Sequence, residues 1–158
     1  MGSTLTQGDL EKLLDRIVQE VTELVTGIAL RPWEGPLKGD PRTVRIDFKK
    51  GALTSLTLCT DAALLARMTQ NALNAESPAA QDMAEFAKEF FNILCGKIAT
   101  VLYKETKVSA RFSVPRFYDS RYEPEDRRVQ FVLTYADEHQ GGAQLIHYVP
   151  RDGENTAT

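Results

Sequence analysis

The sequence contains little cysteine and little histidine, with two residues of each among its 158. Cys59 and Cys95 are far apart and lie among apolar residues, which is typical of buried, reduced thiols. His139 and His147 lie in or beside the last predicted hairpin, with no cysteine or further histidine at a metal-ligand spacing. We therefore expect no metal site, and we expect these histidines to contact solvent or to pack in the hairpin.

Long apolar runs and an excess of basic residues are also missing. No apolar run approaches the roughly 20 residues that a membrane-spanning helix needs. The start has no charged region followed by an apolar stretch, which predicts that there is no secretory signal and that the protein is cytoplasmic. The formal net charge is -3. Because nucleic-acid binding normally requires a basic face, we expect neither a nucleic acid nor a membrane as partner.

Three well-known catalytic motifs are missing as well. The chain has no glycine-rich phosphate loop, no Gly-x-Ser-x-Gly and no His-Glu-x-x-His. These motifs carry nucleotide binding, serine hydrolysis and zinc proteolysis, so those function classes have no support.

What is present fits one globular domain. The hydrophobic fraction of 42% and the charged fraction of 26% are ordinary for such a protein. A chain of 158 residues is long enough to bury a sizeable core. We expect a single domain over residues 7–150 and a polar tail over residues 151–158.

Two hydrophobic periodicities divide the domain into helices and strands. Apolar residues at three- and four-residue steps predict helices over residues 10–28, 60–70 and 77–104. Ser77 and Pro78 suit the N-cap and first position of the longest helix. Alternation of apolar and polar residues predicts strands over residues 43–49, 53–59, 108–114, 129–135 and 143–149. This order predicts an α+β fold, a mostly antiparallel sheet with long amphipathic helices packed on it.

The longest predicted helix has two distinct faces. At about 100° per residue, six apolar side chains share the side expected to pack on the sheet: Met83, Ala87, Phe90, Leu94, Ile98 and Val101. The opposite side carries Glu85, Glu89, Asn92, Gly96 and Tyr103. We expect this second group to face solvent, where another protein can reach it.

Glu89 and Asn92 are the most informative pair on that exposed face. The Glu-x-x-Asn spacing places a carboxylate and a carboxamide one helical turn apart, where together they can bind a partner and hold a water molecule. Exposed polar residues on an amphipathic helix need no function, but asparagine is a poor residue for a helix interior, which favours a functional role. Gly96 costs a helix about 0.5–1 kcal/mol relative to alanine. It has two interpretations, a close contact inside the protein or clearance for a partner.

The spacing of these residues resembles the signature of the CheC/CheX/FliY family, phosphatases that act on phosphorylated CheY-type chemotaxis response regulators. The family pattern is Asp or Ser, three residues, Glu, two residues, Asn, twenty-two residues and Pro. Glu89, Asn92 and Pro115 match it, while Glu85 stands at the Asp or Ser position. Because the chain carries one such pair where CheC-type proteins usually carry two, it is most similar to CheX.

The resemblance implies a role for each of these residues. Asn92 is expected to orient the water that attacks the acyl phosphate, and Glu89 to anchor the complex through an ion pair with a lysine of the receiver. Glu85 and Gly96 are expected to contact the partner, and Pro115 to have a structural role. The protein is expected to need no cofactor of its own, because the receiver supplies Mg²⁺. Proteins similar to CheX form homodimers through their sheets, so a homodimer is expected too.

Three functions remain open from the sequence. The first is a protein aspartyl-phosphate phosphatase that acts on a CheY-type response regulator in chemotaxis or motility signalling. The second is a non-catalytic module that docks a receiver domain or a motility component, which the altered residue Glu85 keeps open. The third is a scaffolding domain in which the motif is merely part of the surface.

Overall fold

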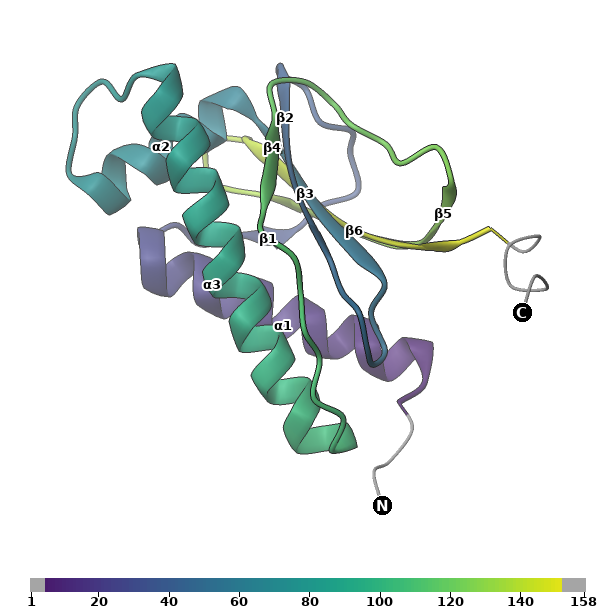
Figure 1. Ribbon diagram of the computed structural model, residues 1–158. Helices are drawn as coiled ribbons and strands as arrows, with labels where there is room; N and C mark the ends of the chain where they lie inside the picture. The colour runs from purple at the N-terminus through teal and green to yellow at the C-terminus, as the bar shows by residue number, and fades with distance from the viewer. Residues whose placement is uncertain (1–4, 152–158) are drawn as a thin grey trace.

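The computed structural model describes residues 5–151 and contains three helices and six strands in that range. The helices are α1 (Gln7–Thr26), α2 (Ala62–Leu73) and α3 (Ala80–Thr106). The strands are β1 (Arg31–Pro32), β2 (Pro41–Asp47), β3 (Ser55–Asp61), β4 (Arg116–Tyr118), β5 (Arg127–Ala136) and β6 (Gly142–Pro150). The strands form one antiparallel sheet in the order β1-β5-β6-β3-β2-β4, and the helices lie on one side of it (Figure 1). The predicted α+β class and antiparallel sheet are confirmed.

Helix α1 begins and ends at residues suited to those positions. Thr6 is its N-cap, and the threonine hydroxyl accepts a hydrogen bond from the backbone N–H of Asp9 at 3.0 Å. Gly27 follows the last turn with a φ of 72°, a left-handed conformation that glycine adopts without steric cost. Between these caps the buried side chains repeat at three- and four-residue steps: Leu10, Leu14, Ile17, Val18 and Val21. The predicted first helix is confirmed, with a slightly earlier start.

Helix α3 carries its predicted apolar face into the core, where the fully or almost fully buried side chains include Ala87, Phe90, Leu94 and Ile98. The predicted start at Ser77 and Pro78 is wrong, because the helix begins at Ala80 with Ala79 as its N-cap. The carboxylate of Asp82 accepts a hydrogen bond from the backbone N–H of Ala79 at 3.1 Å. This bond satisfies a free donor at the helix end and stabilises the later start.

The centre of the sheet is the pair β3 and β6, which joins distant parts of the chain. Their antiparallel register places Ser55 opposite Tyr148. Every residue of β3 is buried. The side chains of this pair that belong to the hydrophobic core under the helices include Leu56, Leu58 and Leu145.

His147 of β6 is fully buried. Of the two surroundings expected for this histidine, packing inside the protein is therefore the one observed. Its Nε2 accepts a hydrogen bond from the backbone N–H of Thr54 at 3.0 Å. In a neutral ring the proton therefore lies on Nδ1, which donates to Oε1 of Gln130 at 2.7 Å. Burial lowers the pKa of His147 to about 4, so the ring is neutral at pH 7.

The segment between α3 and β4 differs from the prediction. The sequence predicts a strand over residues 108–114, but this segment makes only an isolated bridge at Phe112. The ladder resumes at β4, between the strands predicted over residues 108–114 and 129–135. The backbone N–H of Ser113 still donates to the carbonyl of Asp47 at 2.8 Å, which holds the segment beside β2. Pro115 has no N–H to donate, and it interrupts the ladder just before β4.

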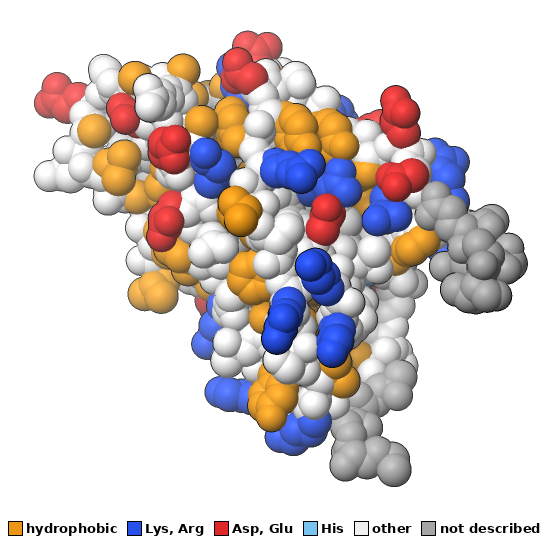
Figure 2. All heavy atoms as spheres, viewed as in Figure 1, with side chains coloured by type: hydrophobic (Ala, Val, Ile, Leu, Met, Phe, Trp, Pro, Cys, Tyr) orange, Lys and Arg blue, Asp and Glu red, His pale blue; other side chains and the backbone are white. Residues whose placement is uncertain are grey.

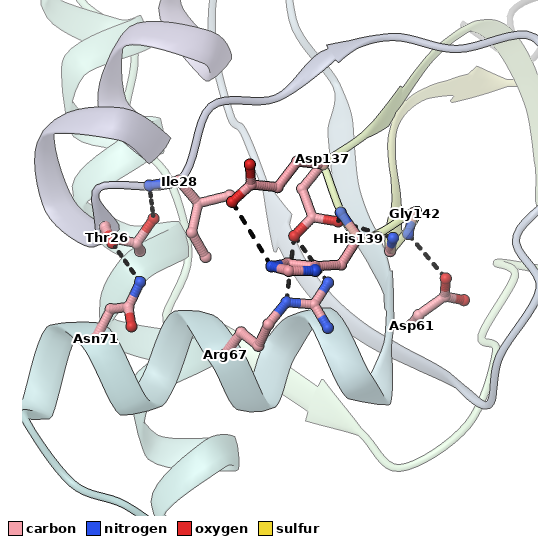
Figure 3. A network of polar contacts seen from close by, with 10 residues as sticks. Thr26, Ile28, Asp61, Arg67, Asn71, Asp137, His139 and Gly142 are labelled. Carbon is pink, nitrogen blue, oxygen red and sulfur yellow. Dashed lines mark hydrogen bonds and ion pairs between the residues drawn. The ribbon is translucent and has the colours of Figure 1, made fainter.

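A polar network ties the turn between β5 and β6 to the helices (Figure 3). Asp137 in that turn accepts two hydrogen bonds from Arg67 of α2, at 3.2 and 2.7 Å, and its side chain is almost fully buried. One turn later on α2, Asn71 donates to the backbone carbonyl of Thr26 at the end of α1, at 2.9 Å. These contacts fix α1, α2 and the turn relative to one another. Removing Arg67 would leave the buried carboxylate unpaired.

Cys59 and Cys95 are both buried and unpaired, as predicted. Burial raises the pKa of the Cys95 thiol well above its usual value. Within residues 5–151, no three histidine, cysteine or acidic side chains lie together as potential metal ligands. None of the described helices has the length and apolar composition that crossing a membrane requires. The predicted polar tail lies, apart from Arg151, outside the described residues.

Candidate functional site

Glu85, Glu89 and Asn92 lie on the side of α3 that faces away from the core, and all three are exposed. Tyr103 on the same side is 50% exposed. Figure 2 views the molecule from the side on which α3 lies, and acidic side chains are visible near the first half of the helix. The predicted division of this helix into a core face and an exposed face is confirmed.

The segment that follows α3 returns beside the helix and forms the second wall of an open groove. Residues 112–115 line this groove together with Glu85, Glu89 and Asn92, and its volume is about 390 Å³. Pro115 belongs to the second wall. The proline that is distant in the sequence therefore meets the Glu-x-x-Asn pair in space.

The side chains of Glu89 and Asn92 are free for an external partner. Neither forms a hydrogen bond or an ion pair with another described residue. The carboxylate offers acceptors alone, while the carboxamide offers a carbonyl acceptor and two N–H donors. Glu85 differs, because its Oε2 lies 3.6 Å from Nζ of Lys88. An exposed pair of this kind contributes little to stability.

Sequence reasoning missed part of the groove. Lys88 lines it from α3, and helical spacing is the signal that places this lysine one turn before Asn92. Phe112 and Val114 line the other wall, where Val114 is 81% exposed. A strand prediction for that segment gives no hint that it borders the helix.

Gly96 lies one turn beyond Asn92, and its surroundings are open. Apart from the adjoining residues and backbone of α3 itself, a Cβ atom built at this position would meet no atom within 4 Å. An internal close contact therefore does not explain the glycine, and this interpretation is excluded. The open surface beside Asn92 leaves clearance for a partner as the remaining interpretation.

We expect the substitution Gly96→Ala to raise the free energy of unfolding by about 0.5–1 kcal/mol. The added methyl group fits without a clash, and it reduces the backbone freedom of the unfolded chain. Urea unfolding of both proteins measures the difference. A destabilised variant would show that the helix needs glycine at this position for its own structure.

A larger groove, of about 860 Å³, lies between the end of α1, β1, α2 and the β5–β6 turn. Its polar side chains include Arg67, Asn71 and Asp137, which bind one another or the end of α1 (Figure 3). None of the signature residues lines it. We therefore take the groove on α3 as the candidate functional site.

Solved structures share the fold. CheX from Vibrio vulnificus has a TM-score of 0.74 at 14% sequence identity, covering 92% of this chain and 99% of that chain. CheX from Borrelia burgdorferi, in its complex with CheY, BeF3 and Mg²⁺, has a TM-score of 0.73 at 13% identity, covering 90% and 99%. FliY from Thermotoga maritima has a TM-score of 0.58 at 14% identity, covering 95% and 93%. At these identities the likeness establishes the fold.

The family of this chain is identified by the match of its sequence to a family model. No curated protein sequence matches the chain. The model of the family described as "Chemotaxis phosphatase CheX" matches residues 42–133, which is more than half of the chain. This range includes Glu85, Glu89, Asn92 and Pro115. With the antiparallel fold and the groove in agreement, the chain belongs to the CheX family.

Proposed function

We propose that the protein is a phosphatase for the phosphorylated aspartate of a CheY-type response regulator, and that the groove on α3 is its active site. The observation that carries this proposal is the meeting of Glu89, Asn92 and Pro115 at one open groove. Membership of a family described as chemotaxis phosphatases supports it. A similar fold that was solved in complex with CheY also supports it.

The reaction transfers a phosphoryl group from the aspartate to water. The water oxygen forms a new bond to phosphorus, and the bond between phosphorus and the aspartate oxygen breaks. The products are the free carboxylate, inorganic phosphate and a proton. This transfer depends on positioning and charge neutralisation, with little covalent help from the protein. In this proposal the partner binds the Mg²⁺, and the α3 groove supplies the positioning.

Asn92 has the chemistry needed to orient the attacking water. Its carbonyl oxygen accepts a hydrogen bond from the water, and its amino group donates to a phosphoryl oxygen. The side chain projects from a helix whose other face is packed in the core, so the backbone at Asn92 is held in a fixed place. The glutamine of Ras-type GTPases has a comparable task.

Glu89 anchors the complex in this proposal. It lies one helical turn before Asn92, and its carboxylate forms an ion pair with a lysine of the receiver's active site. This pair holds the receiver and also sets the distance from Asn92 to the phosphoryl group. The open surface at Gly96 gives the receiver room to approach the helix.

The direct test is the lifetime of a phosphorylated CheY-type receiver with Mg²⁺, measured with and without this protein. We expect the loss of the phosphoryl group to accelerate in proportion to the concentration of the protein. The control is the same receiver with an equal amount of heat-denatured protein. An unchanged lifetime with several receivers from the same genome would exclude the catalytic proposal.

A non-catalytic docking module is the second candidate, and Glu85 favours it. This residue stands where the family pattern has Asp or Ser, and its longer side chain is paired with Lys88 beside the groove. Such a module binds the receiver without changing the lifetime of its phosphoryl group. Calorimetric titration with the receiver separates this candidate from a scaffolding domain, which would not bind.

The homodimer that the resemblance implies is also a proposal. The outer strands β1 and β4 have two and three residues, which is short for pairing between two sheet edges. A dimer through the sheet therefore needs side-chain contacts in addition to backbone pairing. Light scattering at micromolar concentration tests it, and a monomer mass would exclude the dimer.

A further inference from the structure

Cationic side chains gather at the end of the molecule where α3 stops and β2 turns into β3. This basic end consists of Lys49, Lys50, Lys104, Lys107 and Arg111, all of which are exposed. None of these side chains forms an ion pair or a hydrogen bond with another described residue. The acidic residue among residues 103–111 is Glu105. Positive charge therefore exceeds negative charge in these two stretches, although the whole chain has a net charge of -3.

Backbone contacts bring the two stretches together. The backbone N–H of Lys49 donates to the carbonyl of Arg111 at 2.9 Å. Next to this bond, Phe48 and Phe112 form a β-bridge, and the centres of their rings lie 5.5 Å apart. The turn after β2 and the segment after α3 therefore lie side by side, so the cations of both belong to one surface.

The charged side chains are unevenly distributed over the face that α3 presents. Figure 2 shows Lys and Arg side chains over the end of α3 and the segment that follows it, and acidic side chains near the start of the helix. Lys104 follows Asn92 by twelve residues, which is about 18 Å along the helix axis. Exposed charges further apart than a Debye length of about 8 Å are largely screened from each other. The net charge, from which no membrane partner is expected, therefore does not describe the basic end.

Two exposed side chains with apolar surface lie among these cations. Tyr103 is 50% exposed and Val108 is 42% exposed. Nζ of Lys107 lies 6.0 Å from the centre of the Tyr103 ring. Tyrosine and lysine both have an apolar body and a polar end, which suits the boundary between lipid headgroups and acyl chains. The basic end therefore combines positive charge with side chains that can enter this boundary.

We propose that the basic end binds the surface of a membrane that contains anionic lipids. Most of its cations are lysines, whose ammonium groups are point charges on flexible stems and suit phosphate groups without fixed positions. A folded acidic protein would favour arginine, which binds carboxylates in a fixed geometry. None of the five residues lines either groove described above, which fits an extended surface better than an inserted peptide. Because no residue of the α3 groove takes part, this inference does not depend on the proposed function.

The test is co-sedimentation of the full chain with lipid vesicles at about 0.1 M salt. One set of vesicles is neutral phosphatidylcholine, and the other contains about 30% phosphatidylglycerol as the anionic lipid. We expect the partition coefficient to be at least about tenfold greater for the anionic vesicles, and to fall as salt is added. Each cation near an anionic surface strengthens binding about fivefold, so Lys49→Glu/Lys50→Glu is expected to weaken it more than about 25-fold.

The matched control is Arg31→Glu/Lys38→Glu, which makes the same change in net charge at exposed residues. Arg31 belongs to β1, which pairs with the end of β5, and Lys38 donates to Oε1 of Gln140 in the β5–β6 turn. The β5–β6 turn precedes the first residues of β6, whereas the β2–β3 turn lies beside the last ones. The control charges are therefore at the opposite end of the sheet, and this variant should keep the wild-type partition coefficient.

Several outcomes would overturn the inference. They are equal binding of the wild-type protein to neutral and anionic vesicles, unchanged binding of the lysine variant, and an equal loss in the control. Tighter binding to soluble polyglutamate than to anionic vesicles, at equal concentrations of negative charge, would also overturn it and would indicate an acidic protein as the partner. If charge reversal prevents folding, Lys49→Gln/Lys50→Gln replaces it, with an expected loss of about 25-fold.

Discussion

Replacement of Asn92 by alanine is expected to lower kcat for dephosphorylation about 100-fold, with binding of the phosphorylated receiver largely kept. The side chain is exposed on α3 and has no partner among the described residues, so its removal leaves the fold intact. What is lost is the amide that orients the attacking water. Single-turnover loss of the phosphoryl group, at saturating concentrations of the protein, measures the effect.

Two further variants separate Asn92 from its neighbours. Glu89→Ala is expected to weaken binding and turnover together, because the same ion pair holds the receiver and sets the position of Asn92. Gln81→Ala removes another exposed amide of α3, one that does not line the groove, and should leave both quantities unchanged. An Asn92→Ala protein as active as the parent would mean that another group orients the water.

Acidification from pH 7 to pH 4 is expected to lower the free energy of unfolding by about 3 kcal/mol through His147 alone. Burial lowers the pKa of this ring from its usual 6.5 to about 4. At pH values between the unfolded pKa of 6.5 and the folded pKa of about 4, the unfolded chain binds a proton that the folded chain does not. The free energy of unfolding therefore falls as the pH falls. Protonation would also place an N–H at Nε2, where the backbone N–H of Thr54 already donates.

Urea unfolding at pH 7 and at pH 5 measures this effect, and His147 should account for about 2 kcal/mol of the loss by pH 5. His147→Gln is expected to flatten the dependence on pH, while His139→Gln, at an exposed histidine, should keep it. If His147→Gln does not fold, an NMR titration of the wild-type ring replaces it. A His147 ring that titrates near pH 6.5 would contradict the prediction.

The features that could be predicted from the sequence are those of a helix that is buried on one side, because its apolar residues then recur with the helical period. The core face of α3 and the exposure of Glu89 and Asn92 follow from a single period of 3.6 residues. Pro115 is different, because no local pattern places it beside α3. The resemblance implied a structural role for Pro115, and its position at the groove beside Glu89 and Asn92 was not predicted.

The features that sequence reasoning missed depend on tertiary contacts. Ser77 and Pro78 suit the start of a helix. The carboxylate of Asp82 instead accepts a hydrogen bond from the backbone N–H of Ala79, and this contact favours a helix that starts later. The alternation over residues 108–114 reflects Phe112 packing against the core, without a continuous ladder of hydrogen bonds. For the same reason, the second wall of the groove, residues 112–115, could not be recognised before the segment was placed beside the helix.

The pairing of β3 with β6 also determines when the chain can fold during its synthesis. Ser55 lies opposite Tyr148. Strand β3, from the first half of the chain, therefore cannot pair with β6 until nearly all of the described residues have been synthesised. Helix α3 lies between them in the sequence and leaves the ribosome before the sheet beneath it can close. Pairing over such a separation is slow. During that interval the apolar face of α3 is uncovered, and a nascent chain of this protein is a candidate client for chaperones.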